Sequence, residues 1–220
     1  MSESLRKMYE EHHATARNAG FSIMKSDRGH FFSEVIGKGK KILDLGCRDG
    51  ALTSFFSEGN SVLGVDIDEL SLAKAHKTLG IEVKAFDIQS EWLTLSGRTF
   101  DVAVAGEFLE HVYYPNKVSR KVSKVLVPGG IFVGSVPNAF SLKNRIKYLF
   151  AIKKYTPLSD PTHINQFSAR ELKQMLGEFF SEVKIVGMGR LGFLARRCPG
   201  LFAFDLCFVA KNPQDRGDSK

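Results

Sequence analysis

The stretch KILDLGCRDG, residues 41–50, decides how this chain folds. Its first five residues form a short, mostly apolar run, which predicts a buried strand. The next five residues include Gly46 and Gly50, and glycines at such positions let the backbone turn tightly and lie close to a ligand. We therefore expect a strand that leads into a ligand-binding turn and then into a helix.

The same alternation of strand and helix extends along the rest of the chain. Further short apolar runs predict strands at 61–65, 81–86, 100–105, 131–136, 182–187 and 201–210. Helical patterns predict helices at 27–37, 51–58, 69–79 and 116–126, and a capping box at Ser168–Glu171 begins another. This alternation predicts a doubly wound, mostly parallel α/β sheet with helices on both faces.

Length and composition predict one folded domain, 1–220. The chain has 220 residues, of which 43% are apolar and 25% charged, and these values exclude disordered and collagen-like classes. The sequence contains no apolar run long enough to span a membrane and no signal-peptide pattern, so we expect a cytoplasmic protein. Its three cysteines lack the spacing of disulfide or zinc motifs, so we expect no metal. The expected parts are a helical lead-in (1–37, with a helix at 2–18), a ligand-binding half (38–136), a helical lid insertion (137–167), the rest of the sheet (168–211) and a fraying tail (212–220).

Carboxylates stand at or directly beyond the ends of the first three predicted strands. Asp66 stands at the end of the second strand, twenty residues after Gly46, where a carboxylate can accept hydrogen bonds from a ribose diol. Asp87 closes the third strand, where it can accept from an exocyclic amine such as that of adenine. A nicotinamide-binding G-x-G-x-x-G motif is not formed, because positions 48 and 51 are arginine and alanine.

These residues resemble the class I S-adenosylmethionine-dependent methyltransferase superfamily over about residues 35–210. The match comprises the glycine turn after Asp44, the acids Asp66 and Asp87, and LVPGG at 126–130, which resembles the turn before the fifth strand. The sequence AGEFLEHV at 105–112 and the element HINQFS at 163–168 are similar to the ubiquinone-biosynthesis O-methyltransferases. The resemblance implies a Rossmann-like sheet of seven strands with the last one antiparallel, and S-adenosylmethionine as cofactor.

The resemblance also implies roles for individual residues. The methionyl end of the cofactor is expected at Asp44, Gly46, Cys47 and Gly50, the ribose at Asp66 and Ile67, and the adenine at Asp87 and Ile88. Glu107 is expected to face both cofactor and acceptor. Arg28 either reaches the cofactor carboxylate or faces solvent. Arg48 replaces the usual middle glycine, and we expect its side chain to point outward, pairing with Asp49.

The acceptor side has two candidate bases. One helix face is expected to carry Glu107, Glu110 and His111, because they are spaced at i, i+3 and i+4. There His111 acts as a general base, or all three residues hold a divalent metal, or they only stabilise the helix. His163, in the insertion, is the alternative base, an acceptor-orienting residue or a surface histidine.

The sequence lacks the [DN]-P-P-[YF] element and the catalytic cysteine of nucleic-acid base methyltransferases after the fourth strand, which favours a hydroxyl of a small or lipid-linked molecule. The alternatives are an inactive binding module and an RNA methyltransferase.

Charge is distributed unevenly along the chain. Residues 1–111 carry 13 basic and 17 acidic side chains, whereas residues 112–220 carry 18 and 7. The segment 141–154 has five basic residues, no acidic residue and an apolar helical stripe, so it either lies on an anionic membrane, closes over an anionic or lipid-linked acceptor, or packs as an ordinary lid. Arg190, Arg196 and Arg197 would extend its basic rim, and under the first of these alternatives the protein would bind peripherally at the inner membrane face.

Overall fold

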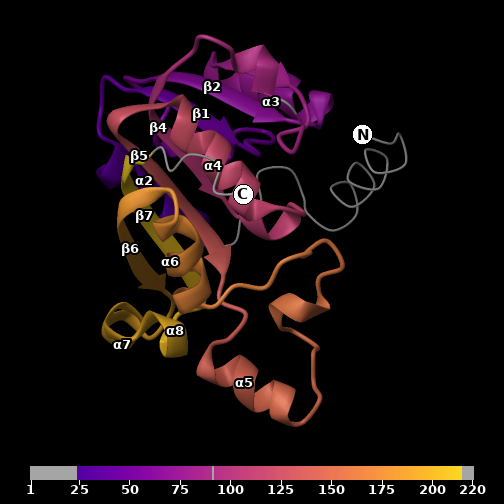
Figure 1. Ribbon diagram of the computed structural model, residues 1–220. Coiled ribbons are helices and arrows are strands. Elements are labelled where there is room, and N and C mark those ends of the chain that lie inside the picture. The colour runs from indigo at the N-terminus through magenta and orange to yellow at the C-terminus, as the bar shows by residue number, and fades with distance from the viewer. Residues whose placement is uncertain (1–23, 91, 215–220) are drawn as a thin grey trace. The chain divides into compact units, whose positions relative to one another are not determined.

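The computed structural model describes residues 24–90 and 92–214, in which seven strands form one sheet (Figure 1). The strands hydrogen-bond in the order β3-β2-β1-β4-β5-β7-β6. They are β1 (Lys41–Leu45), β2 (Ser61–Asp66), β3 (Glu82–Ala85), β4 (Phe100–Gly106), β5 (Leu126–Pro137), β6 (Phe180–Met188) and β7 (Asp205–Pro213). The last strand, β7, pairs antiparallel with both neighbours, which confirms the predicted sheet. The chain divides into two compact units, unit 1 (Met1–Val104) and unit 2 (Ala105–Lys220), and β4 contributes to both.

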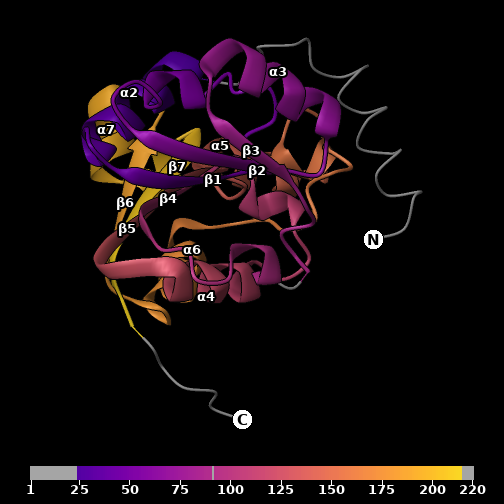
Figure 2. The same ribbon diagram turned by 90° about the horizontal axis from the view of Figure 1, so that it is seen from above.

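Unit 1 contains the parallel strands β1, β2 and β3 and most of β4. Four of the five β1 residues are buried, as the apolar run predicts for a strand in the middle of a parallel sheet. Its helices are α2 (Lys25–Ile36), α3 (Glu69–Leu79) and the short 3-10 turns η1 (Thr53–Phe55) and η2 (Trp92–Leu95). Figure 2 shows α3 lying along β2 and β3, against which it packs. Asp68 caps the start of α3 by accepting from the Ser71 N–H, and Gly80 ends it in a left-handed conformation.

Unit 2 is built on the antiparallel strands β5, β7 and β6. Its main core is a group of phenylalanines, in which the Phe132 ring lies 5.0 Å from Phe208 and 5.9 Å from Phe180. Two helices, α4 (Pro115–Val125) and α6 (Ala169–Gly177), contact each other beside this sheet, and the predicted capping box at the start of α6 is formed. The 3-10 turn η3 (Leu109–His111) follows β4.

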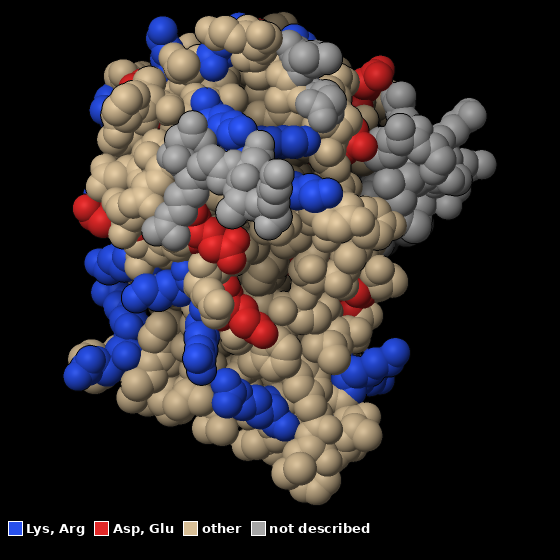
Figure 3. Space-filling view, in the orientation of Figure 1, with Lys and Arg blue, Asp and Glu red and all other residues tan. Residues whose placement is uncertain are grey.

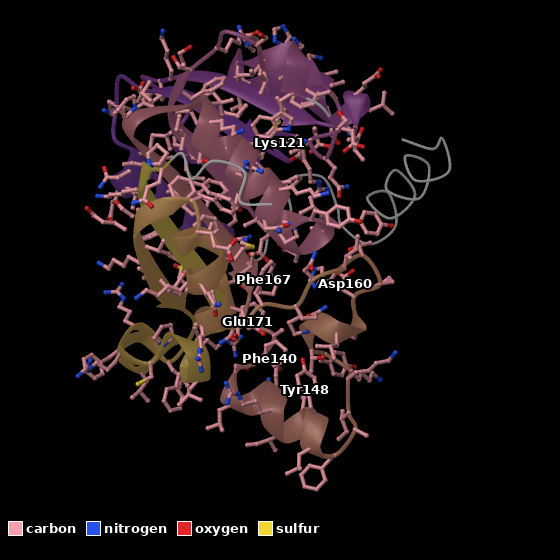
Figure 4. All side chains as sticks on the ribbon, in the orientation of Figure 1. Lys121, Phe140, Tyr148, Asp160, Phe167 and Glu171 are labelled. Carbon is pink, nitrogen blue, oxygen red and sulfur yellow. The ribbon has the colours of Figure 1, made fainter. Side chains whose placement is uncertain are left out.

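The insertion and the late loop of unit 2 add short helices at its lower end in Figure 1. The insertion contains α5 (Leu142–Leu149) and the 3-10 turn η4 (Pro157–Ser159), and the late loop contains α7 (Gly192–Arg197) and α8 (Pro199–Phe202). Buried Asn138 joins these parts, because its side chain donates to the Ala203 carbonyl at 3.0 Å and its own carbonyl accepts from Asn144 at 3.0 Å. The Phe140 and Tyr148 rings meet edge to face, so α5 is fixed to the end of β5 (Figure 4).

Four predicted elements differ from the structure. The fifth strand, expected at 131–136, is longer, because β5 already begins at Leu126 and includes the LVPGG stretch that was expected to be a turn. The helix expected at 51–58 is reduced to η1, because the Thr53 hydroxyl is engaged by Asp44 and this serine- and phenylalanine-rich stretch has weak helix propensity. The strand expected at 201–210 begins only at Asp205, because Pro199 starts a helical turn before it. The basic helix expected over 141–154 ends at Leu149, after which Ala151 adopts a left-handed conformation. The lead-in helix at 2–18 and residues 215–220 of the tail lie outside the described residues.

In the part of the chain that the structure describes, no helix has the length and apolar character needed to cross a membrane.

Candidate functional site

The turn after β1 has the backbone that the glycines predict. Gly46 and Gly50 have φ of 70° and 77°, and Arg48 between them also lies in the left-handed region at 49°. A Cβ at Gly50 would lie 2.6 Å from a methyl group of Leu79, so only glycine lets α3 pack this close to the turn. The N–H groups of Gly46 and Cys47 both donate to the Val65 carbonyl, which ties the turn to β2.

Cys47 packs against β2 rather than into open space. A Cβ at Gly64 would lie 2.6 Å from the Cys47 sulfur, so the glycine makes room for the thiol. Burial raises the pKa of the Cys47 thiol well above its ordinary value, and the nearby carboxylates of Asp44 and Asp66 add to the rise. The thiol is therefore neutral and does not act as a nucleophile.

Asp44 is a buried carboxyl at the carboxyl end of β1. It is 4% exposed and accepts a hydrogen bond from the Thr53 hydroxyl at 2.6 Å. Burial raises its pKa to about 7; the hydrogen bond from Thr53 opposes the rise, and the negative charge of Asp66 adds to it. A positively charged ligand group near Asp44 would favour its ionised form.

Asp66 connects the turn to the end of β2. Its Oδ2 accepts from the Arg48 N–H at 3.0 Å, while its Oδ1 accepts from the N–H groups of Ile67 and Asp68 at 2.7 and 3.0 Å. This carboxylate is fixed by backbone donors at the position predicted for ribose contact, and Ile67 follows it half-buried.

The third acidic position follows β3. Asp87 is half-buried and accepts from the Gln89 N–H at 2.9 Å, and the next residue, Ile88, is buried. The Ile88 carbonyl accepts from the Trp92 indole at 2.7 Å, which fixes the loop after the strand. In the parallel register Asp66 pairs with Ala85, so the carboxylates after neighbouring strands lie at the same edge of unit 1.

The sequence analysis singled out two arginines of unit 1, Arg28 and Arg48. Arg28 is 1% exposed, so the solvent-facing alternative is wrong; α2 packs so tightly on η1 that a Cβ at Gly29 would lie 2.3 Å from the Phe55 ring. Its reach to a cofactor carboxylate stays a prediction. Arg48 is half-buried with its Nε atom buried, and its backbone N–H donates to Asp66; the outward orientation and the pairing with Asp49 stay predictions.

These residues fit S-adenosylmethionine. The cofactor carries a sulfonium and an ammonium group, ribose hydroxyls and an adenine amine, all of which are cations or hydrogen-bond donors. Unit 1 presents acceptors to match, with buried Asp44 and Asp66 beside a glycine turn and Asp87 beyond β3. Bound there, S-adenosylmethionine would supply an electrophilic methyl carbon.

In unit 2, Glu107 does not share a helical face with Glu110 and His111, which corrects the prediction. Glu107 has φ of 54°, and η3 begins only at Leu109 and spans three residues. The Glu107 N–H donates to the carbonyl and the hydroxyl oxygen of Ser135, at 3.0 and 3.2 Å, and the same hydroxyl donates to Glu107 Oε1 at 2.9 Å. The carboxylate is therefore held against β5.

The two candidate bases, His111 and His163, come together although 52 residues separate them in the chain. Their rings are 4.9 Å apart at an interplanar angle of 70°. Glu110, 1% exposed, lies beside them with Oε1 3.7 Å from His111 Nε2, and Asp160 Oδ2 lies 3.6 Å from His163 Nε2. His163 is mostly buried, so the surface-histidine alternative is wrong.

The loop before α6 builds this cluster, which sequence reasoning identified only in part. The Thr162 carbonyl accepts from His111 Nδ1 at 3.0 Å, and the Asn165 N–H donates to the Glu110 carbonyl at 2.9 Å. Asp160, labelled in Figure 4, accepts from both the N–H and the hydroxyl of Thr162, at 2.9 and 2.6 Å. The Asp-Pro-Thr sequence is a turn signal, but nothing local to it identifies His111 as the partner.

Glu110, His111 and His163 also have the composition of a metal site. One ligand atom from each lies within 4.8 Å of the others. His163 thus takes the place that the sequence analysis gave to Glu107 in the metal alternative.

Comparison with known proteins agrees with these observations. A family model described as a methyltransferase domain matches residues 12–179. The chain is 37% identical over 119 residues to the ubiquinone biosynthesis O-methyltransferase of Pseudomonas fluorescens (strain SBW25), covering 52% of this chain and 50% of that protein. It is 34% identical over 152 residues to the protein of the same name in Aliivibrio fischeri (strain ATCC 700601 / ES114), and this match covers 64% of this chain and 63% of that protein. The chain thus spans about half the length of the first of these curated relatives.

Solved structures share the fold at low sequence identity. A SAM-dependent methyltransferase from Archaeoglobus fulgidus superposes with a TM-score of 0.66 at 19% identity, over 93% of this chain and 99% of that one. The plantazolicin methyltransferase BpumL, solved with S-adenosylhomocysteine, gives a TM-score of 0.64 at 16% identity, and the match covers 96% of this chain and 91% of that one. Since the family model matches well over half of its residues, this chain belongs to the methyltransferase domain family, within the class I S-adenosylmethionine-dependent methyltransferases.

Proposed function

We propose that this chain transfers a methyl group from S-adenosylmethionine to a hydroxyl oxygen of a small-molecule or lipid-linked acceptor. The family supports methyl transfer, and the curated relatives are named O-methyltransferases. The carboxylates of unit 1 suit the cofactor, and the histidine cluster of unit 2 suits an acceptor that must lose a proton.

The observation that carries the proposal is the hydrogen bond between His111 Nδ1 and the Thr162 carbonyl. A carbonyl oxygen only accepts, so Nδ1 carries the proton and Nε2 keeps the lone pair that a general base needs. The buried Glu110 carboxyl beside Nε2 would stabilise the imidazolium that forms. An amine or thioether acceptor has less need of such a base.

The reaction then divides between the side chains as follows. Asp44, Gly46 and Gly50 would hold the methionyl end of the cofactor, while Asp66 and Asp87 would accept from its ribose and adenine. His111 Nε2 would take the proton of the acceptor hydroxyl, and bound S-adenosylmethionine would supply the electrophilic methyl carbon, with S-adenosylhomocysteine as the leaving group. Correct positioning of the two reactants supplies about 7–11 kcal/mol of the barrier reduction in reactions of this kind.

His163 and Glu107 are the further catalytic candidates. His163 Nε2 lies near Asp160, and its ring packs on His111, so it orients the base or the acceptor. The Glu107 carboxylate accepts from the Ser135 hydroxyl and would also accept from an acceptor hydroxyl.

The test measures S-adenosylhomocysteine released from S-adenosylmethionine with a panel of phenols, catechols, amines and RNA. We expect turnover with hydroxyl acceptors, a loss of about 100-fold or more in His111→Gln, and unchanged S-adenosylhomocysteine affinity in that variant. His76→Gln is the matched control, because His76 Nδ1 also lies 2.9 Å from a carbonyl oxygen, that of Ile81, but outside the cluster.

Three results would contradict the proposal. Turnover only with amines or RNA would assign another acceptor class. Full activity in His111→Gln would remove the base from the mechanism. Folded protein that binds neither S-adenosylmethionine nor S-adenosylhomocysteine would be the inactive binding module.

A further inference from the structure

Two segments of unit 2 carry basic residues and no acidic ones. Residues 138–159, around α5, contain five lysines and arginines, and residues 188–204, around α7 and α8, contain three. The two segments adjoin, because α5 contacts α8 and α8 contacts α7. In Figure 3 blue side chains gather over this lower end, and no red atom is visible over these helices. We refer to the exposed side chains of 142–155 and 190–204 as the basic apolar surface.

Large apolar side chains stand out from the same surface. Leu149 is 81% exposed, Phe150 69%, Tyr155 79% and Phe193 76%. Others that are at least two-fifths exposed are Leu142, Ile146, Ile152, Leu191, Leu194 and Phe204. Single exposed apolar residues are ordinary, but so many on adjoining helices mark an interaction surface.

The exposed residues after α5 lie on an ordered loop. The Lys147 ammonium group donates to the carbonyls of Lys154 and Tyr155, at 3.0 and 3.3 Å, and so folds the loop back on the helix. Ala151 and Tyr155 take left-handed conformations in this turn. The turn therefore presents Leu149 and Phe150 outward instead of letting them collapse onto the sheet.

We propose that the basic apolar surface docks unit 2 on an anionic lipid bilayer. Lysines and arginines that flank exposed leucine and phenylalanine match the negative headgroups above an acyl region. A second copy of the chain would bring eight like charges against eight, and single-stranded nucleic acid has little use for exposed leucine and isoleucine. The inference goes beyond the proposed function and is independent of catalysis; if both hold, the acceptor is drawn from a membrane.

The test is co-sedimentation of the full chain with vesicles of phosphatidylcholine alone or with about 30 mol % phosphatidylglycerol. We expect binding to the anionic vesicles at least tenfold tighter than to the neutral ones. The double variant Leu149→Glu/Phe150→Glu should lose at least tenfold in affinity for anionic vesicles, and so should Lys153→Glu/Lys154→Glu. Leu70→Glu, a change at an equally exposed leucine of α3, is the matched control and should bind like the parent.

Folding and the cofactor site are followed separately, by circular dichroism and by S-adenosylhomocysteine affinity, which none of these variants should alter. Equal binding to neutral and anionic vesicles, or no loss in either double variant, would overturn the proposal. So would a concentration-dependent dimer that Leu149→Glu/Phe150→Glu dissociates, since the surface would then join two copies. RNA binding that depends on Lys153 and Lys154 but not on Leu149 would assign the surface to nucleic acid instead.

Discussion

Asp44→Asn should remove a pH dependence of stability that arises from the burial of this carboxyl in unit 1. The folded state raises the pKa of Asp44 from 3.8 to about 7, chiefly because the carboxyl is buried. Between those two pH values the folded chain holds a proton that the unfolded chain has lost, so the free energy of unfolding falls as pH rises. Above about pH 7 both states are ionised and the loss is complete.

A rise of about three pKa units corresponds to about 4 kcal/mol, which is an upper value for the loss across this range. Asparagine has no charge to bury, and its side-chain oxygen can still accept from the Thr53 hydroxyl. We therefore expect Asp44→Asn to unfold within about 1 kcal/mol of the parent near pH 4 and to be about 2–4 kcal/mol more stable near pH 8.

The assay is urea unfolding of both proteins, followed by circular dichroism at pH steps from about 4 to about 8.5, without cofactor. The difference between the two curves isolates Asp44 from other titrating groups. Asp27→Asn on α2, where the aspartate is exposed, controls for the loss of one negative charge. Parallel stability profiles for Asp44→Asn and the parent would refute the reasoning, because Asp44 would then ionise in the folded state as it does in the unfolded chain.

Other expectations follow from the same geometry. Gly64→Ala should cost about 1–3 kcal/mol in urea unfolding, because the new methyl group would overlap the Cys47 sulfur, and adding Cys47→Ala should recover most of the loss in a double-mutant cycle. Asn138→Ala should cost about 1–3 kcal/mol by leaving buried carbonyls without their donor, whereas surface Asn116→Ala should change stability by less than about 0.5 kcal/mol. The affinity for S-adenosylmethionine, measured by calorimetry, should increase with increasing pH in the parent, by up to tenfold per pH unit below about pH 7, because the cationic ligand favours ionised Asp44. In Asp44→Asn this pH dependence should be absent.

The elements that the sequence predicted well are those with local signals at both ends. The helix expected at 69–79 has the observed bounds of α3, since Asp68 and Gly80 cap it from within the same stretch of chain. The capping box at Ser168 is likewise a local pattern, and it is formed. In contrast, the helix expected at 51–58 is not formed because the Thr53 hydroxyl donates a hydrogen bond to Asp44, and no local sequence pattern indicates that contact.

The site residues divide in the same way. The carboxylates at the ends of β1 and β2 and after β3 are local features of the strand ends, and the parallel register brings these ends to one edge of unit 1; their contacts with a cofactor stay predictions. The meeting of His111 and His163 depends on how the loop after η4 folds onto η3, through Thr162 and Asn165, and such long-range contacts have no sequence period. The predicted helical grouping with Glu107 was wrong because a left-handed backbone at that residue interrupts the spacing.

Glu107 shows how a strained residue can serve a site. A left-handed conformation costs a non-glycine residue on the order of 1 kcal/mol, and glycine would remove that cost. Three hydrogen bonds to Ser135 hold the Glu107 N–H and carboxylate in place and offset the strain. Arg48 in unit 1 is held in the same way, by the bond from its N–H to Asp66. At both positions the backbone N–H would keep its acceptor in a glycine variant, but at Glu107 the bond from the Ser135 hydroxyl to the carboxylate would be lost. The carboxylate is therefore the part of Glu107 that glycine could not replace, and it is also the part that the proposed contact with the acceptor would use.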